Sequence, residues 1–205
     1  MTIKLYYSPG ACSLSPHIAL READVPFELV QVDLAEKKLK ASGASYLSIN
    51  PKGYVPAITL ENGELLTEGA IIVQYIADQK PEKQLAPKQG TPQRYRVQEW
   101  LHFIATELHK GFGPVNNPKT NDEAKQFFKN RLLSRFEFLN RSLEGRQFLL
   151  GDQFTVADGY AYYTLRNLKR LDASVLEKSP LLGQYFQRVE SRPAVQAALK
   201  AEGLS

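Results

Sequence analysis

Cysteine is almost absent from this sequence. Cys12 is the only cysteine among 205 residues, which excludes an intrachain disulfide and any zinc site built from several cysteines. Histidine is also scarce, since only His17, His102 and His109 occur, and we therefore expect no metal centre formed by the protein alone. Disulfide chemistry at Cys12 would need a second thiol from a small molecule or from another chain.

Long hydrophobic runs are missing as well. The most apolar stretch, residues 69–77, is nine residues long and contains Gln74, whereas a membrane-spanning helix needs about 20 apolar residues. The polar turn Ser8-Pro9-Gly10 comes too early in the chain for the apolar core of a signal peptide. We expect no membrane partner and a cytoplasmic, reducing compartment.

A strong excess of one charge sign is not found either. The net charge is +4 and the isoelectric point is about 9.0, with a net charge of −2 over residues 1–80 and +6 over residues 81–205. Basic residues of the second part alternate with acidic ones, and only Lys37, Lys38 and Lys40 form a small basic cluster. This pattern is typical of solvated helical surfaces, and we expect no nucleic acid partner.

The residues that are present indicate two regions that meet near residue 80. In the first, apolar and β-branched runs alternate with helical spacing, and Asn62-Gly63 between two apolar runs is a strong hairpin signal. We predict a first domain over residues 1–79 with the order β-α-β-α-β-β-α. Its strands are expected over residues 3–7, 27–34, 57–60 and 64–66, and its helices over residues 14–23, 38–47 and 68–78.

The second region is predicted to be helical. Residues 80–93 contain three prolines, a glycine and many polar side chains, which predicts a linker. Beyond it, helical apolar spacing predicts an all-helical domain over residues 94–205, so that the fold class is α/β plus all-α. Thr155 and Asp158 have the spacing of a capping box and are assigned to folding rather than to catalysis. The helices are expected over residues 95–111, 122–143, 156–171, 181–189 and 194–201.

The first chemical motif surrounds Cys12. A strand ends at Tyr7, a Ser-Pro-Gly turn follows, and a helix begins near Cys12 or Ser13. The unpaired N–H groups and the positive dipole end of a helix favour an anion there, and they lower the pKa of a cysteine at that position. The alternative is that Cys12 is simply a small buried residue.

The second motif is the segment of residues 50–56, Asn-Pro-Lys-Gly-Tyr-Val-Pro. Pro56 cannot donate a ladder hydrogen bond, so it marks the start or the edge of a strand. A cis Val55–Pro56 bond would leave the N–H and C=O groups of Val55 free for an extended ligand. The sequence does not distinguish this arrangement from a trans turn, and only about 5–6% of X–Pro bonds in folded proteins are cis.

The third motif is Thr67-Glu68-Gly69, where a hairpin strand leads into a helix. The first N–H groups of that helix suit a carboxylate and the side chain of Glu68 suits an ammonium group, so that together they would recognise an α-amino acid. The alternative is structural: Thr67 caps the helix and Glu68 only complements its dipole.

These motifs resemble those of the bacterial beta class of glutathione transferases. The resemblance extends over essentially the whole chain and includes residues 4–17, 50–56, 66–72, 99–101, 106–112 and 151–158. It implies a thioredoxin-like N-terminal domain, an all-helical C-terminal domain and a homodimer. It also implies that glutathione is bound as a co-substrate, with no cofactor.

The resemblance assigns catalytic roles to four residues. Cys12 would face the glutathione sulfur. Ser13 and Tyr6 would supply further donors near that sulfur, and His109 would belong to the same catalytic site.

It also assigns the binding of the rest of glutathione. The backbone of Val55, next to Pro56, would pair with the cysteinyl residue, and Glu68 and Gly69 would hold the γ-glutamyl end. The basic positions near the glycine carboxylate and the active-site cleft would be Lys37, His109 and Lys110.

Two positions depart from the pattern of the beta class. His102 stands where asparagine is frequent, at a binding position associated with the site of the partner subunit. Asn167-Leu168 stands where an aromatic residue is common, so the pocket for the electrophile is expected to differ.

The resulting hypothesis is a transferase that conjugates the glutathione thiolate to electrophilic, largely apolar co-substrates, with the helical domain forming a wall of the electrophile site. Two alternatives remain open from the sequence. One is a glutathione-dependent thiol–disulfide transferase that uses Cys12, and the other is a non-catalytic carrier of glutathione adducts.

Overall fold

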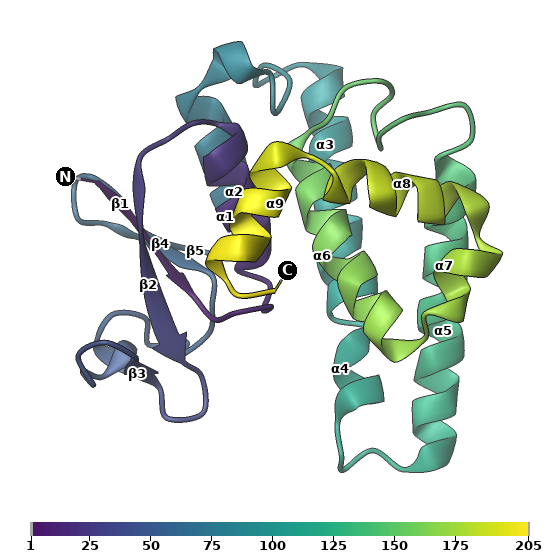
Figure 1. Cartoon of the computed structure of the whole chain (residues 1–205), viewed down its shortest axis with the longest axis horizontal. Coiled ribbons are helices and arrows are strands. Elements are labelled where there is room, and N and C mark those ends of the chain that lie inside the picture. Colours follow the sequence, from purple (N-terminus) through teal and green to yellow (C-terminus); the bar gives the residue numbers. More distant parts are fainter. Residues whose placement is uncertain (1, 205) are drawn as a thin grey trace. The chain divides into compact units, whose positions relative to one another are not determined.

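The computed structural model describes residues 2–204 and contains two compact units (Figure 1). Unit 1 consists of residues 1–86 together with residues 191–205, and unit 2 consists of residues 87–190. The boundaries expected from the sequence assign the whole C-terminal part to the helical domain. In the structure the last helix instead returns to unit 1, because it makes buried polar and apolar contacts there.

A five-stranded mixed sheet forms the centre of unit 1, with the strand order β3-β2-β1-β4-β5. β1 pairs with β2 in parallel and with β4 antiparallel. β4 and β5 form the hairpin that Asn62-Gly63 predicts, with Gly63 at φ +89° in the turn. The strands are β1 (Ile3–Tyr7), β2 (Phe27–Asp33), β3 (Lys38–Leu39), β4 (Ala57–Thr59) and β5 (Leu65–Thr67).

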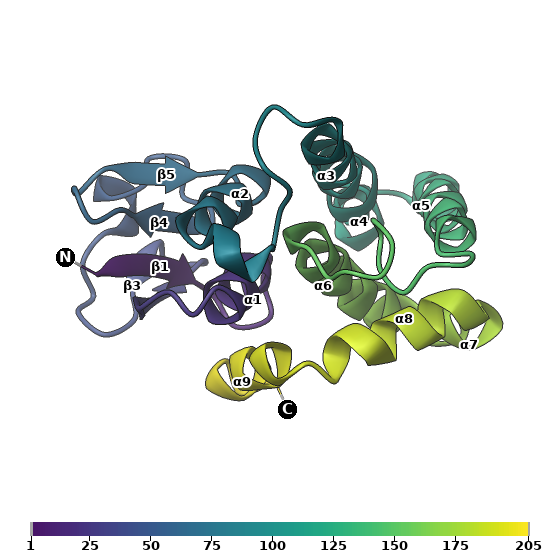
Figure 2. The ribbon, with the colours of Figure 1, turned by 90° about the horizontal axis from the view of Figure 1, so that it is seen from above.

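The helices α1 (Leu14–Glu22) and α2 (Gly69–Gln79) pack against each other on one face of this sheet (Figure 2). Their apolar faces include Ile18 and Ile72, which are fully buried. α9 (Pro193–Ala201) packs beside α1 within the same unit. Burial of these apolar faces provides the main driving force for the packing.

The helix predicted over residues 38–47 is wrong. Asp33 accepts hydrogen bonds from the N–H groups of Ala35 and Glu36, and so turns the chain back along the edge of the sheet. β3 then pairs with β2, and the chain continues through a turn at Gly43, at φ +71°, into the 3-10 helix η1 (Tyr46–Ser48). The open edge of β2 thus offers backbone partners that outweigh a weak helical pattern.

Unit 2 is built from helices, as predicted. α6, whose first ten residues are all buried, packs against α3, η3, α7 and α8. The single helix predicted over residues 95–111 consists of α3 followed by a π-helical turn, η3. The elements are α3 (Pro92–Phe103), η3 (Ile104–His109), α4 (Phe112–Asn116), α5 (Asp122–Ser142), α6 (Val156–Leu171), α7 (Ser174–Lys178) and α8 (Pro180–Glu190).

The predicted fold class is therefore confirmed: a thioredoxin-like mixed sheet with helices precedes an all-helical region. The predicted linker contains one 3-10 helix, η2 (Pro81–Lys83), and ends where α3 begins. Across residues 2–204, no helix has both the length and the apolar character needed to span a membrane.

Candidate functional site

The three predicted motifs meet at one edge of the sheet in unit 1, namely the edge formed by the carboxyl ends of β1 and β5. β1 and β5 run in the same direction, because both are antiparallel to β4. The helices that follow them, α1 and α2, therefore begin at the same edge. The segment of residues 50–56 leads into β4 at this edge as well, since β4 runs in the opposite direction.

The turn that carries Cys12 connects β1 to α1, as predicted. Its conformation is stabilised by the buried hydroxyl of Ser13, which accepts a hydrogen bond from the N–H of Ser8 at 3.2 Å and donates to the carbonyl of Ser8 at 3.3 Å. Gly10 adopts φ +70° in this turn. The Ser13 side chain thus stabilises the turn, and these contacts do not support its predicted role as a donor to a ligand sulfur.

Cys12 is half-buried and contacts the second motif directly. Its Sγ donates a hydrogen bond to the carbonyl oxygen of Val55 at 3.1 Å. The Val55–Pro56 peptide bond is cis, which is one of the two arrangements that the sequence left open. The carbonyl of Val55, expected to be free for a ligand, is therefore occupied by the Cys12 thiol, and this bond exists only while the sulfur carries its proton.

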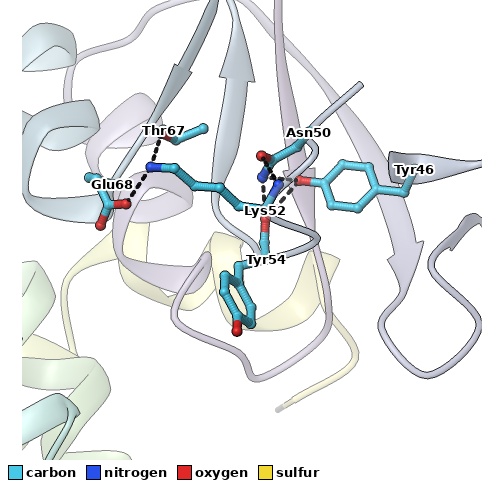
Figure 3. A network of polar contacts seen from close by, with 6 residues as sticks. All are labelled: Tyr46, Asn50, Lys52, Tyr54, Thr67 and Glu68. Carbon is cyan, nitrogen blue, oxygen red and sulfur yellow. Dashed lines mark hydrogen bonds and ion pairs between the residues drawn. The ribbon is translucent and has the colours of Figure 1, made fainter. Parts of the chain in front are cut away.

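Buried polar side chains hold the segment of residues 50–56 in place (Figure 3). The Asn50 amide and the Tyr46 hydroxyl both donate to the carbonyl of Tyr54, at 2.8 and 2.9 Å. Asn50 Oδ1 accepts the backbone N–H of Lys52 at 3.1 Å. Burial raises the pKa of Tyr46, so that its hydroxyl keeps its proton and remains a donor.

The side chain of Lys52 reaches from this segment to the third motif (Figure 3). Its Nζ lies 2.8 Å from Glu68 Oε1 and 3.0 Å from Thr67 Oγ1. Thr67 therefore accepts from a lysine and belongs to β5, so the alternative in which it caps α2 is wrong. Glu68 has the positive φ of +69°, a region that non-glycine residues rarely occupy.

Gly69 begins α2 directly after the N-cap residue Glu68, whose own side chain makes no capping hydrogen bond. A Cβ atom added at Gly69 would lie 3.5 Å from Cγ of Pro56, so the two residues are neighbours. The first N–H groups of α2 consequently lie close to the start of β4. Such groups favour a negatively charged ligand.

Lys37 approaches the same segment from the loop before β3. Its Nζ donates to the carbonyl of Gly53 at 2.9 Å and lies 5.7 Å from the centre of the Tyr54 ring. The structure thus brings Lys37 to the segment that contains Val55. Its predicted contact with a glycine carboxylate remains a prediction.

Tyr6 is buried in the core of unit 1. Its ring packs against Tyr46 with the ring centres 5.6 Å apart, and its hydroxyl accepts a hydrogen bond from Thr59 Oγ1 at 3.2 Å. The Tyr6 hydroxyl is therefore engaged with β4, and these contacts do not support its predicted role beside the glutathione sulfur.

His109 belongs to unit 2, where its ring contacts two tyrosines of α6. Nδ1 lies 2.8 Å from the hydroxyl of Tyr160, and Nε2 lies 3.4 Å from that of Tyr163. Burial, together with the charge of Lys110, lowers the pKa of His109 to about 4. The ring is therefore neutral at pH 7, and this does not fit the expectation of a basic group near the glycine carboxylate.

The other two predicted residues of unit 2, His102 and Lys110, have exposed side chains. His102 lies at the end of α3, where its main-chain carbonyl accepts a hydrogen bond from Thr106 Oγ1. Their roles toward glutathione remain predictions.

Lys52 was not among the predicted site residues, although it belongs to the segment of residues 50–56. The predicted hairpin carried the necessary signal, because it brings Thr67 and Glu68 next to the segment that leads into β4. As for metals, the structure of residues 2–204 contains no group of three or more His, Cys, Asp or Glu side chains arranged to bind an ion.

Comparison with known proteins identifies the family. Residues 1–78 match the family described as "Glutathione S-transferase, N-terminal domain", and residues 105–202 match "Glutathione S-transferase, C-terminal domain". The glutathione S-transferase GstA of Escherichia coli O157:H7 is 45% identical over 202 residues, which correspond to 98% of this chain and 100% of GstA.

Two solved structures support the same assignment. A sphingomonad glutathione S-transferase complexed with glutathione is 47% identical, with a TM-score of 0.91 and coverage of 98% of this chain and 100% of that chain. A bacterial beta class glutathione S-transferase from Sphingomonas chungbukensis is 45% identical, with the same TM-score of 0.91 and coverage of 98% and 100%. The predicted family is confirmed: the chain belongs to the glutathione S-transferase family of enzymes and is close to its bacterial beta class.

Proposed function

We propose that glutathione binds in an extended conformation at the sheet edge where α1, α2 and β4 begin. The glutathione thiolate then attacks an electrophilic carbon of a largely apolar co-substrate. A carbon–sulfur bond forms, and the leaving group departs with its bonding electron pair. In this mechanism the protein contributes orientation and stabilisation of the thiolate.

The contact between Cys12 and Val55 is the observation that carries this proposal. It joins the start of α1 to the segment expected to pair with the cysteinyl residue of glutathione. A cysteinyl residue that pairs with the backbone of Val55 would thus have its sulfur close to Cys12. The Cys12 thiol can then turn from the Val55 carbonyl and donate its proton in a hydrogen bond to the glutathione thiolate, while the cysteinyl N–H takes its place at that carbonyl.

The two ends of glutathione have complementary groups nearby. The γ-glutamyl end carries an ammonium and a carboxylate, which suit Glu68 and the first N–H groups of α2. Lys37 is a cation beside the segment of residues 50–56, and it suits the glycine carboxylate at the other end. We retain His102, His109 and Lys110 as predicted contributors from unit 2, with His109 acting as a neutral ring.

A second candidate reaction uses Cys12 as the exchanging sulfur. The Cys12 thiolate would attack a glutathione mixed disulfide, form Cys12–S–S–glutathione and release the other thiol. A second glutathione would then regenerate Cys12 and leave as glutathione disulfide. The half-buried position of Cys12 at the start of α1 is the observation that favours this candidate.

The variants Cys12→Ala and Cys12→Ser separate the two reactions. We expect both variants to lose disulfide exchange completely, because the chain has no other cysteine. Conjugation of an aryl halide should be retained in Cys12→Ser, which keeps a donor group, and should be retained at a similar or reduced rate in Cys12→Ala. Parallel assays and mass spectrometry of the oxidised wild type, which should gain one glutathione, provide the measurement.

Each of three results would contradict one of these assignments. Conjugation at background level in both folded variants, with unchanged glutathione affinity, would show that Cys12 itself is catalytic. Disulfide exchange that persists in either variant would exclude the proposed exchange at Cys12. Saturable binding without any turnover in the wild type would instead favour the carrier.

We further propose that the enzyme is a homodimer and acts in the cytoplasm, where thiols are kept reduced. Support for a dimer comes from family membership and from an aromatic cluster of Trp100, Phe103 and Phe138 on α3 and α5. Its rings lie 5.2 to 6.0 Å apart, and 46% of Phe138 is exposed to solvent. A partly exposed aromatic cluster of this kind is typical of a protein interface.

A further inference from the structure

The Lys52–Glu68 ion pair lies beside the first N–H groups of α2, where the γ-glutamyl end of glutathione is proposed to bind. Both side chains are more than half exposed, and an exposed ion pair contributes only about 0–1 kcal/mol to stability. The fold therefore gains little from it. Glu68 nevertheless has φ +69°, an unfavourable backbone conformation that is typically found at functional sites.

Hydrogen bonds hold both the backbone and the side-chain ammonium group of Lys52 (Figure 3). Its backbone N–H donates to the buried Asn50, and its Nζ donates to Thr67 and Glu68. An ammonium group has three N–H donors, and the described residues supply acceptors for two of them. One donor of Lys52 is thus left for a ligand, without any need to break the contact with Glu68.

We infer that Lys52 is a specificity-determining residue that binds the α-carboxylate of the γ-glutamyl end while Glu68 binds its ammonium group. An α-amino acid carries these two opposite charges on a single carbon, and Lys52 and Glu68 place the complementary charges 2.8 Å apart. The N–H groups at the start of α2 would share the carboxylate with Lys52. This inference rests on the proposed binding of glutathione at this edge.

Three peptides test the assignment on the full-length enzyme. They are glutathione, its 4-aminobutyryl analogue, which lacks the α-carboxylate, and its glutaryl analogue, which lacks the ammonium group. The variants are Lys52→Met and Glu68→Gln. The matched control is Lys40→Met, because Lys40 is also an exposed lysine of unit 1 in an ion pair, with Asp33 at 3.4 Å.

Lys52→Met should raise the dissociation constants of glutathione and of the glutaryl analogue about tenfold, a change that corresponds to about 1.4 kcal/mol. The dissociation constant of the 4-aminobutyryl analogue should change by less than about twofold. Glu68→Gln should show the reverse selectivity and spare the glutaryl analogue. KM for glutathione should rise in Lys52→Met with little change in kcat, because the lost contact is far from the sulfur. Lys40→Met should behave as the wild type.

Three outcomes would overturn the inference. An equal loss for glutathione and the 4-aminobutyryl analogue in Lys52→Met would show that Lys52 only orients Glu68. A gain in glutathione affinity would show that Lys52 competes with the ligand for Glu68. Unchanged affinities would show that Lys52 has no role in binding. The proposed function would then still hold. A wild type that binds no glutathione would overturn the proposed function itself.

Discussion

The ring of His109 lies between the hydroxyls of Tyr160 and Tyr163, and this environment determines its protonation state. One ring nitrogen must donate and the other must accept in the neutral form, so one tyrosine accepts and the other donates. A protonated ring would turn both nitrogens into donors inside a mostly apolar setting next to Lys110. Burial therefore holds the pKa of His109 near 4, well below the ordinary value of 6.5.

This pKa predicts a pH dependence of stability. Between pH 6.5 and about 4 the unfolded chain binds a proton at His109 that the folded chain does not bind. The contribution of His109 is therefore fully present above pH 6.5 and is lost as the pH falls through this window. The loss is on the order of 3 kcal/mol at most. Urea unfolding of the wild type and of His109→Gln at several pH values measures it.

The variant should lose less stability than the wild type between pH 7 and pH 4.5. His102→Gln is the matched substitution at an exposed histidine of the same unit, and the difference between the two variants isolates the buried ring of His109. A His109→Gln variant with the same pH dependence as the wild type would contradict the assignment.

At the scale of single residues, the members of the motifs could be predicted from the sequence, but the contacts between them could not. Cys12 was predicted at a helix start and Val55 in the glutathione site. The hydrogen bond between them, however, depends on how β1, α1 and β4 are arranged in space. The family resemblance implied catalytic donors at Tyr6 and Ser13, but in the structure the hydroxyl of Tyr6 accepts from Thr59 and that of Ser13 bonds to the backbone of Ser8. Charge and hydroxyl chemistry can be predicted from a sequence, but burial of a particular side chain depends on tertiary packing.

At the scale of elements, the start of α6 shows a predicted local signal that tertiary contacts extend. Asp158 accepts hydrogen bonds from the N–H and the Oγ1 of Thr155, at 2.8 and 3.0 Å, which agrees with the predicted capping box. It also accepts from the N–H of Leu149 and the hydroxyl of Tyr185, which the sequence did not predict. Asp158 therefore joins α6 to α8 and to the loop before α6.

This difference predicts the relative cost of two substitutions. Thr155→Ala removes one donor and should lower the free energy of unfolding by roughly 0.5–2 kcal/mol. Asp158→Ala leaves buried donors of Thr155, Leu149 and Tyr185 without an acceptor, and should cost more than about 3 kcal/mol. Urea denaturation measures both, and glutathione affinity should change little in the Thr155 variant once it is folded.

Asn121→Ala serves as the comparison for the Thr155 substitution. Asn121 caps the exposed start of α5 by accepting from the N–H of Ala124 at 2.8 Å, and its loss should cost about 1 kcal/mol. If Asp158→Ala were no more destabilising than Asn121→Ala, the tertiary role of Asp158 would be excluded.

Most elements could be predicted because each carries its own periodic pattern and its own turn signals. Residues 38–47 are the exception, since their pattern was weak and the open edge of β2 supplied the decisive hydrogen bonds. α4 and α7 were not predicted either, and both are only five residues long. The π-helical turn η3 was also not predicted, since it follows α3 without a break in the apolar spacing.

At the scale of the whole molecule, the chain returns to unit 1 after it has completed unit 2. Arg192 binds the carboxylate of Glu22 with two hydrogen bonds, one of them 2.9 Å long. Further along, the buried carboxylate of Glu202 accepts from the N–H of Gly10 at 2.9 Å and contacts Nδ1 of His17 at 2.8 Å. Sequence patterns did not indicate this return, because a helix at the end of a helical region carries no signal for its partner.

The His17 ring determines the direction of these hydrogen bonds. Arg21 Nε donates to His17 Nε2 at 2.9 Å, so Nδ1 carries the proton and donates to Glu202. The side chains of His17 and Glu202 are fully buried, and Glu202 is the acceptor for two donors, the buried ring of His17 and the half-buried N–H of Gly10. One of these donors, Gly10, belongs to the turn that carries Cys12.

Glu202→Ala should therefore destabilise unit 1 by roughly 1–3 kcal/mol for each of the two donors that it leaves without an acceptor. Hydrogen exchange followed by mass spectrometry should show faster exchange over residues 8–22, with α5 of unit 2 changing less. KM for glutathione should rise, since the Cys12 turn loses the hydrogen bond at Gly10. Lys200→Ala, an exposed substitution on α9, should leave exchange and KM unchanged. Unchanged exchange over residues 8–22 in Glu202→Ala would show that the turn is ordered without its C-terminal partner, and that its conformation depends on Ser13 and α1 alone.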